Sequence, residues 1–173
     1  MGNIYYQSPK ITVRDSLESD MDNFIPNIRE IEIRETFSLA GCGIDEAVRS
    51  SYRLANKRIS CVDMSGNILA MIGVGDLPYN CGHSPRLGLL DGKGGTLFSF
   101  GTKRSTTHSL ELTRRASPII YNELKRGYDF LSVWVADYMT SALKLAAMHG
   151  FKIADITVSQ DGTIFKRIDW HRS

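Results

Sequence analysis

The spacing of hydrophobic residues along the chain predicts alternating strands and helices. Residues 11–14 alternate apolar and polar side chains, as a strand does when one of its faces is buried. Two helices are expected after this strand. The first starts near Phe24 and should bury apolar residues that recur at roughly helical spacing, namely Ile25, Ile28, Ile31 and Phe37. The second starts near Asp45 and should bury Ala47, Val48, Tyr52 and Ala55.

The middle of the chain predicts a β-hairpin, a long loop and a further strand. Residues 58–64 and 68–74 are strand-like runs joined by Ser65-Gly66-Asn67, a turn whose Gly and Asn tolerate positive φ. Residues 75–95 are rich in glycine and lack periodicity, which indicates a loop, and loops of this length are often functional. The strand is expected over residues 96–100.

The last third of the chain predicts a helix, a buried strand, a second helix and a terminal hairpin. The first helix, over residues 110–126, contains Pro118, which should kink or restart it. Residues 130–135 form an apolar run typical of a strand that is covered on both faces. A compact helix over 140–148 precedes a hairpin within 153–170. The predicted fold class is therefore α/β, with a mixed, twisted central sheet, flanking helices and a C-terminal β-hairpin.

Composition is that of one globular domain. The chain has 173 residues, of which 42% are hydrophobic and 23% charged, which argues against disorder. We expect residues 1–10 to be an N-terminal arm and residues 11–173 to be a single domain. A net charge of +2 implies no long-range attraction to nucleic acid or anionic lipid. The most hydrophobic stretch, residues 68–74, is far shorter than the ~20 apolar residues of a membrane-spanning helix, so no membrane span is expected.

The three cysteines favour free thiols over a metal site. Cys42, Cys61 and Cys81 are about 20 residues apart, and no C-x-x-C pair is present to bind zinc.

The order of the predicted elements resembles that of the GNAT superfamily of N-acetyltransferases. The resemblance is first one of layout, in which a helix that ends in residues 142–151 precedes the last hairpin. Three stretches are similar to a narrower group, the GNAT-like virion proteins of tailed bacteriophages, which include internal virion proteins: residues 27–32, residues 60–67 with 70–74, and residues 133–151.

The resemblance implies where acetyl-CoA would bind, if it binds. In the superfamily the cofactor lies where two central parallel strands splay, and its pyrophosphate is held by the loop and helix start that follow. The matching residues here are Arg104, Ser105, Thr106, Thr107, His108 and Ser109. When Arg104 is aligned with the first residue of the family motif, Thr107 and Ser109 take positions where the family has small residues, so close approach of the backbone to phosphate is harder.

The catalytic groups that the resemblance implies are missing. Active members have an Asn at the start of the last helix and a Tyr four residues before the Gly-Phe pair, and here these positions are Met139 and Ala146. Tyr138 is adjacent, but a helix turns about 100° per residue, so on a continuous helix it would point elsewhere. The strands offer no clear general base. We therefore expect no catalytic residue and no cofactor, with binding favoured over turnover.

The main functional hypothesis is a structural protein of a phage particle. It would be made in the host cytoplasm, would reside in the virion and would contact other virion proteins in the tail, core or capsid. Partner contacts are expected from the arm and the long loop, through Tyr5, Tyr6, Asp76 and Tyr79.

Two alternatives remain open. The first is an active N-acetyltransferase that uses acetyl-CoA. The second, less well supported, is a protein that contacts DNA during ejection or packaging through the basic pairs at 103–104, 114–115 and 125–126.

Overall fold

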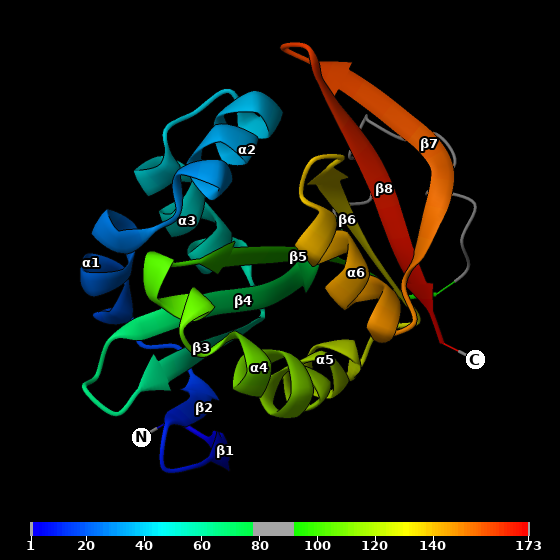
Figure 1. Ribbon diagram of the computed structural model, residues 1–173. Helices are drawn as coiled ribbons and strands as arrows, with labels where there is room; N and C mark the ends of the chain where they lie inside the picture. The colour runs from blue at the N-terminus through cyan, green and yellow to red at the C-terminus, as the bar shows by residue number, and fades with distance from the viewer. Residues whose placement is uncertain (1, 78–91, 173) are drawn as a thin grey trace.

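One sheet forms the centre of the molecule. The computed structural model describes residues 2–77 and 92–172, except the side chains of residues 155 and 156. The strands are β1 (Ile4–Gln7), β2 (Ile11–Asp15), β3 (Lys57–Asp63), β4 (Ile68–Asp76), β5 (Gly94–Gly101), β6 (Phe130–Ala136), β7 (Lys152–Gln160) and β8 (Thr163–His171). They lie in the order β1-β2-β3-β4-β5-β6-β8-β7 (Figure 1), and every neighbouring pair is antiparallel except β5 and β6.

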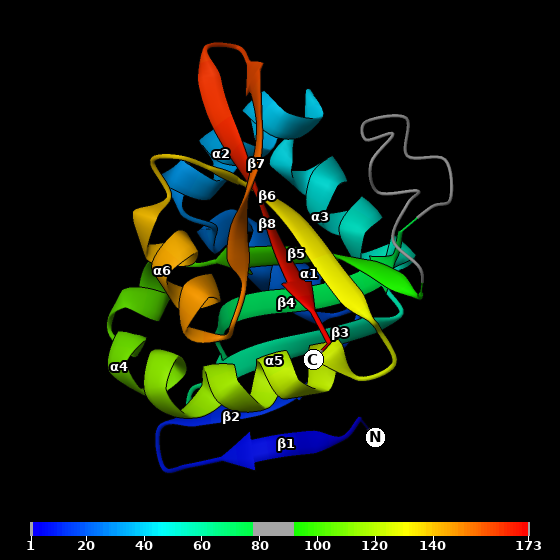
Figure 2. The same cartoon turned by 90° about the vertical axis from the view of Figure 1, so that its right-hand side faces the viewer.

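Helices cover both faces of this sheet (Figures 1 and 2). The α-helices are α1 (Asp20–Phe24), α2 (Glu30–Ala40), α3 (Ile44–Leu54), α4 (Ser109–Glu111), α5 (Ser117–Lys125) and α6 (Thr140–Met148). Two 3-10 turns, η1 (Ile25–Asn27) and η3 (Lys103–Thr106), and one π-helical turn, η4 (Leu112–Ala116), join them. The predicted fold class is confirmed: a mixed sheet with flanking helices and a terminal hairpin.

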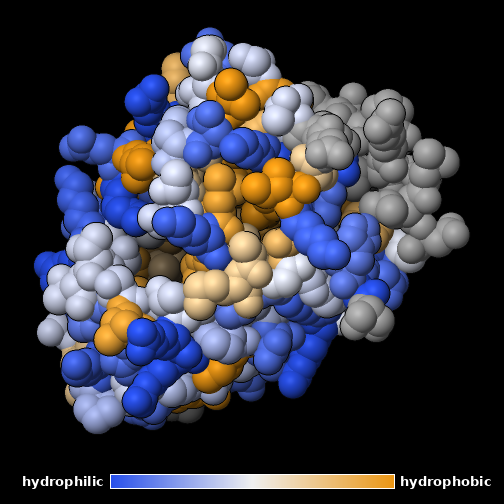
Figure 3. Space-filling view, turned by 45° about the vertical axis from the view of Figure 1, so that its right-hand side comes forward, coloured by the Kyte–Doolittle hydropathy of each residue, from blue (hydrophilic) through white to orange (hydrophobic). Residues whose placement is uncertain are grey.

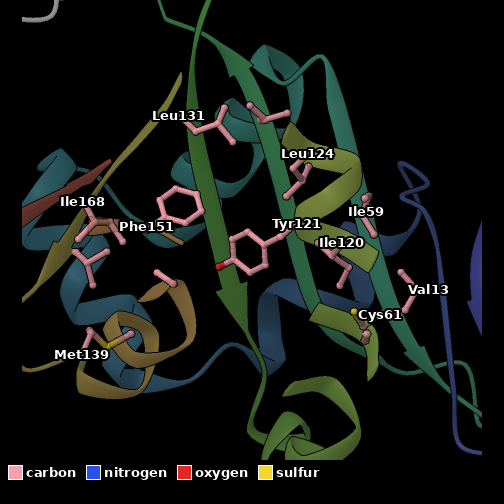
Figure 4. Packing of buried hydrophobic residues seen from close by; sticks show 14 of the residues in the cluster. Val13, Ile59, Cys61, Ile120, Tyr121, Leu124, Leu131, Met139, Phe151 and Ile168 are labelled. Atoms are coloured by element: carbon pink, nitrogen blue, oxygen red, sulfur yellow. The ribbon is translucent and has the colours of Figure 1, made fainter. Parts of the chain in front are cut away.

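Each face of the sheet has its own hydrophobic core. In the larger core, Ile120 of α5 lies near Ile59, whereas Tyr121 points to Phe151, with ring centroids 5.7 Å apart (Figure 4). The smaller core, on the other face, is built from α1, α3 and the opposite sides of β3, β4 and β5. Since successive side chains of a strand point to opposite faces, β3 can supply both cores from adjacent residues.

The hairpin β3–β4 and the helix α3 match their predictions. In the turn, the Asp63 carboxylate accepts hydrogen bonds from the backbone N–H groups of Ser65 and Asn67, and Gly66 has a φ of 82°. In α3 the expected apolar residues are buried: Ala47, Val48, Tyr52 and, just after the helix, Ala55.

Part of the expected N-terminal arm is a strand at the edge of the sheet. Residues 4–7 form β1 and pair with β2. Tyr5 and Tyr6 are half-buried: the Tyr5 hydroxyl donates to Asp15 Oδ1 over 2.5 Å, and the Tyr6 hydroxyl donates to Glu111 Oε1 over 3.3 Å. Both tyrosines are therefore held by the domain, because each has a carboxylate partner within hydrogen-bond reach.

The single helix expected from Phe24 is divided into two. After α1 and the turn that contains Pro26, Ile28 and Arg29 are extended. Arg29 N–H donates to Gly101 O over 3.1 Å, and Ile28 forms a bridge with Thr102. The helix stops here because its backbone groups pair with the end of β5.

The prediction of which apolar residues this helix buries is also wrong in part. Ile28 is buried, but Ile31 and Phe37 are 41% and 57% exposed. α2 instead buries Glu32, Thr36 and Ser38. Buried polar residues are unusual. Here Glu32 pairs with Arg29, and Ser38 accepts a hydrogen bond of 3.5 Å from the Thr163 hydroxyl.

The helix that contains Pro118 runs from α4 to α5 through the π-turn η4. Proline has no N–H to donate one turn back, and the Ser117 hydroxyl donates to Thr113 O over 2.6 Å beside it. A π-turn is one of the recognised ways in which a helix adjusts at such a point.

Exposed apolar residues also occur on the side that carries β7, β8 and α6. In the space-filling view of this side, hydrophobic residues are visible among hydrophilic ones (Figure 3). The large exposed residues of these elements are Met148, Ile153, Val158 and Ile164. Among the described residues, no helix has the length and apolar character that a membrane crossing requires.

Candidate functional site

The parallel strands β5 and β6 separate soon after they begin. They pair only between Gly94–Thr96 and Phe130–Ser132, whereas β5 continues to pair with β4, and β6 with β8, to their ends. A Cβ at Gly94 would collide with the ring of Phe130, so glycine permits the close start. Beyond it, residues 97–101 and 133–136 have no strand partner on the edges that face each other. We call this opening the wedge, and Figures 1 and 2 show β6 turning away from β5.

Helix α2 spans the open end of the wedge. On the β5 side, the backbone of Gly101 accepts a hydrogen bond from Arg29 N–H and donates one to the Glu32 carboxylate. On the β6 side, Glu35 Oε1 accepts a hydrogen bond of 2.7 Å from Ala136 N–H, a residue 101 positions away in the chain. The polar face of α2 is therefore buried because it satisfies the ends of two separated strands.

The two carboxylates of α2 have different environments. Glu32 is 4% exposed and forms an ion pair with Arg29. Burial raises the pKa of Glu32, and the Arg29 guanidinium opposes this rise. Within the described part of the chain, Glu35 has no cation within ion-pair distance. Burial, and to a smaller extent the negative charge of Glu32, raises the pKa of Glu35 to about 7 against the Ala136 hydrogen bond, which lowers it. Glu35 can thus gain or lose a proton near neutral pH.

Tyr138 lies in the turn between β6 and α6, two residues after the Glu35 partner. Its hydroxyl is buried, and no described residue is its hydrogen-bond partner. The Arg34 guanidinium lies over its ring, 5.1 Å from the centroid. Burial first, and the charge of Glu35 next, raise the pKa of Tyr138, so the hydroxyl keeps its proton. A buried donor without an acceptor is costly, which makes it a candidate for contact with a ligand.

The residues that were matched to the cofactor loop fall into two groups. Arg104, Ser105 and Thr106 are in η3, where the Ser105 and Thr106 hydroxyls donate to Thr102 O and Lys103 O. These hydroxyls thus satisfy carbonyls at the start of the turn itself. The second group, residues 107–109, lines an open groove.

This groove, of about 460 Å³, lies between the β1–β2 turn and the start of α4. Its lining combines hydroxyl groups, three cations and one carboxylate: Ser8, Pro9, Lys10, Thr107, His108, Ser109, Leu110, Glu111, Arg114 and Arg115. The sequence did not indicate that the β1–β2 turn would meet the predicted loop.

The two family positions on the last helix are core positions here. Met139 and Ala146 are both buried in the larger core, where Figure 4 shows Met139 beside α6. Neither carries a group that exchanges protons.

Glu35 and Tyr138 are the site residues that the sequence analysis missed. Tyr138 precedes α6 instead of lying on it, so the helical rotation that was used to set it aside does not apply. For Glu35 the only signal was two glutamates three residues apart, Glu32 and Glu35, within a helix expected to bury an apolar face.

Of the predicted partner residues, Asp76 has contacts within the chain. It accepts a hydrogen bond of 3.0 Å from the Tyr128 hydroxyl and forms an ion pair with Lys93. Tyr79 lies outside the described residues. Partner binding by Tyr5, Tyr6, Asp76 and Tyr79 stays a prediction.

A metal site is not found in the described part of the chain, where no group of three or more His, Cys, Asp or Glu side chains converges. Cys42 and Cys61 are free thiols there, and burial raises the pKa of Cys61 to about 12. Cys81 lies outside the described residues.

Comparison with known proteins identifies the fold through structure alone. No protein-family model and no curated protein sequence matches the chain. A GCN5-related N-acetyltransferase from Kribbella flavida is similar in structure, with a TM-score of 0.66 and 18% identity over 94% of this chain and 98% of that one.

Two further similar structures contain acetyl-CoA. A protein from Salmonella typhimurium, solved with its cofactor acetyl-CoA, has a TM-score of 0.63 and 13% identity over 93% of both chains. A GNAT superfamily phosphinothricin acetyltransferase from Sinorhizobium meliloti, in complex with acetyl-CoA, has a TM-score of 0.60 and 13% identity over 93% of this chain and 88% of that one.

These structures correct one expectation. The prediction of no cofactor is wrong, because proteins of the same fold hold acetyl-CoA. The error came from judging the site by Met139, Ala146 and the loop over residues 104–109, while the wedge and Glu35 depend on tertiary contacts. With its splayed parallel strands, its layout of helices and these neighbours, the chain has the GNAT N-acetyltransferase fold.

Proposed function

We propose that the protein is an N-acetyltransferase that binds acetyl-CoA in the wedge and transfers the acetyl group to an amine. The observation that carries this proposal is the Glu35 carboxylate at the open end of the wedge, on the backbone of Ala136. The acetyl-CoA held by proteins of the same fold supports it. Fold alone does not determine activity, so the proposal depends on the residues at the site.

The residues of the wedge fit the cofactor. Among the described residues, the edge of β5 over residues 97–100, before the Gly101 backbone that α2 occupies, has no strand partner toward β6, so its backbone groups can pair with amides of an extended ligand arm, as in strand addition. The unpartnered Tyr138 hydroxyl gives the site a donor. At the loop, Arg104 would take the place of the first residue of the family motif, and the hydroxyls of Thr107 and Ser109 would take the places of its small residues in holding phosphate.

The chemistry divides between the ligand and two side chains. When bound, acetyl-CoA supplies a thioester carbonyl that an amine can attack, with formation of a C–N bond and loss of the C–S bond. Glu35 uses Oε1 on Ala136 N–H, which leaves Oε2 to accept the proton that the amine gives up. Tyr138 Oη holds a proton that can pass to the departing sulfur. A base with a pKa of about 7 is well matched to work near neutral pH.

The test measures thiol release from acetyl-CoA with a panel of primary amines. Loss of a general base typically lowers the rate by about 100-fold or more, so Glu35→Gln should lose activity to that extent. Glu30→Gln is the matched control, because Glu30 is an exposed carboxylate on the same helix. Tyr138→Phe should reduce turnover and leave acetyl-CoA affinity nearly unchanged. The proposal fails if acetyl-CoA does not bind saturably, or if Glu35→Gln keeps the full rate.

The place of the protein in a phage particle is a separate proposal. It is supported only by the similarity of residues 27–32, residues 60–67 with 70–74, and residues 133–151 to phage virion proteins. On this proposal the protein would reside in the virion after synthesis in the host cytoplasm and would contact other virion proteins. Mass spectrometry of purified particles tests this proposal. It is refuted if the protein is detected in the lysate of infected cells but not in the particles purified from that lysate.

A further inference from the structure

The groove at the start of α4 has the charge and the hydroxyl groups of an anion site. Three cations line it, Lys10, Arg114 and Arg115, and in the described residues none of them is within ion-pair distance of a carboxylate. Its volume of about 460 Å³ is within the roughly 300–1,000 Å³ range of small-molecule sites. Cations that converge on one groove without partners repel one another, and an anion would relieve that repulsion.

The single carboxylate that lines the groove, that of Glu111, already accepts hydrogen bonds from other residues of the chain. Glu111 Oε1 accepts hydrogen bonds from the Ser8 and Tyr6 hydroxyls. These bonds, together with Lys10 and Arg115, lower the pKa of Glu111 and keep it ionised. Glu111 therefore ties the β1–β2 turn to the helix and leaves the cations only partly neutralised.

Local backbone structure brings the three cations to the groove. The Ser8 hydroxyl accepts hydrogen bonds of 3.1 Å from the N–H groups of Lys10 and Ile11, which fixes the turn that carries Lys10. Arg114 and Arg115 are consecutive, and in an α-helix consecutive residues point about 100° apart. Both line the groove here, where the helix widens into the π-turn.

We propose that this groove binds a phosphate monoester through Lys10, Arg114 and Arg115. Guanidinium groups match the oxygens of phosphate in pairs, and an ammonium adds a point charge, which is the combination found here. The phosphate has two possible sources. One is the 3′-phosphate of acetyl-CoA, and this source rests on the proposed function. The other is a separate phosphorylated small molecule.

Calorimetric titrations with three probes distinguish the sources: acetyl-CoA, 3′-dephospho-acetyl-CoA and inorganic phosphate. The variants are Lys10→Gln and the pair Arg114→Gln with Arg115→Gln. Lys152→Gln is the control, because it removes the same charge from an exposed residue of β7. One lost charged hydrogen bond corresponds to about a tenfold loss of affinity.

Two results support the proposal. If the cofactor supplies the phosphate, Lys10→Gln should weaken acetyl-CoA about tenfold and dephospho-acetyl-CoA less than twofold. If the phosphate belongs to a separate molecule, inorganic phosphate should bind to the protein while acetyl-CoA is also bound. The groove variants should then lower the affinity for inorganic phosphate and leave that for acetyl-CoA unchanged. Should acetyl-CoA not bind at all, the proposed function fails, and the phosphate titration still decides the role of the groove.

Two results overturn it. In the first, the groove variants bind every probe with the same affinity as the control Lys152→Gln. In the second, the wild type binds no phosphate probe but binds duplex DNA with a steep salt dependence that the same variants remove, which would assign these cations to nucleic acid.

Discussion

Helices α2 and α3 have the same length and opposite patterns of burial. Both have 11 residues and flank the same region of the fold, and they contact each other. α3 buries Ala47, Val48 and Tyr52 and follows the usual rule for an amphipathic helix. α2 buries Glu32, Thr36 and Ser38 and exposes Ile33 and Phe37. The difference shows that α3 serves the core, whereas α2 closes an opening in the sheet with polar groups.

The largest expected effect comes from a charge placed on the buried side of α3. Val48 is fully buried, so Val48→Asp would put an unpaired carboxylate in the smaller core and should destabilise the protein by more than about 4 kcal/mol. Circular dichroism and the yield of soluble protein measure this. Leu54→Asp, at the last residue of the same helix, which is 75% exposed, should leave the fold intact. An equal loss of stability in both variants would contradict the orientation of α3, which buries Val48 and exposes Leu54.

On α2, removal of the buried polar residue Glu32 should lower the stability of the protein. Glu32→Ala removes the ion-pair partner of Arg29 and the acceptor for Gly101 N–H, and the buried Arg29 Nε already has no hydrogen-bond partner in the described part of the chain. A loss of about 2 kcal/mol in the free energy of unfolding is expected from urea denaturation. Glu30→Ala, an exposed residue of the same turn, is the control. A stability equal to that of the wild type would mean that α2 does not close the wedge through Glu32.

Glu35 should make the stability of the protein depend on pH in the direction opposite to that of a salt-bridged carboxylate. Its pKa rises from the ordinary 4.5 to about 7 on folding, so the folded state holds the proton more tightly. Its contribution is complete below about pH 4.5 and is lost as the pH rises through about 7, a change of about 2 kcal/mol after allowance for partial exposure.

Thermal denaturation from pH 5 to 8 tests this contribution. Glu35→Gln should flatten the profile and raise the melting temperature at pH 8, because the amide oxygen can still accept from Ala136 N–H. The difference between the two proteins isolates Glu35 from His149, whose pKa is lowered by burial and which acts in the opposite direction. Parallel profiles for wild type and variant would show that the Glu35 carboxylate is not desolvated.

The smallest effect is expected on the outer face of α2. Phe37 is 57% exposed, so Phe37→Ser should change the free energy of unfolding by less than about 0.5 kcal/mol. The same urea titration measures it. A loss of more than about 1 kcal/mol would show that Phe37 is covered in solution, and would remove the contrast with α3.

Local chemistry was enough to predict most of the elements. The Ser65-Gly66-Asn67 turn fixed the hairpin β3–β4, and the apolar run of residues 130–135 fixed β6 inside the sheet, because turn residues and strand periodicity act over a few residues. The same reasoning predicted wrongly that Ile31 and Phe37 are buried, because a helical repeat of apolar residues does not determine which elements pack against the helix.

The sequence by itself determined the fold class, most of the strands and helices in their order along the chain, and the apolar face of α3. Only the tertiary structure decided that Glu35 meets Ala136, that the Tyr138 hydroxyl has no hydrogen-bond partner among the described residues, and that Lys10 shares a groove with Arg114. The physical reason is one of range. Periodicity and turn chemistry are local, whereas a site is made where strands separate and distant segments supply the charges and hydrogen bonds that the gap requires.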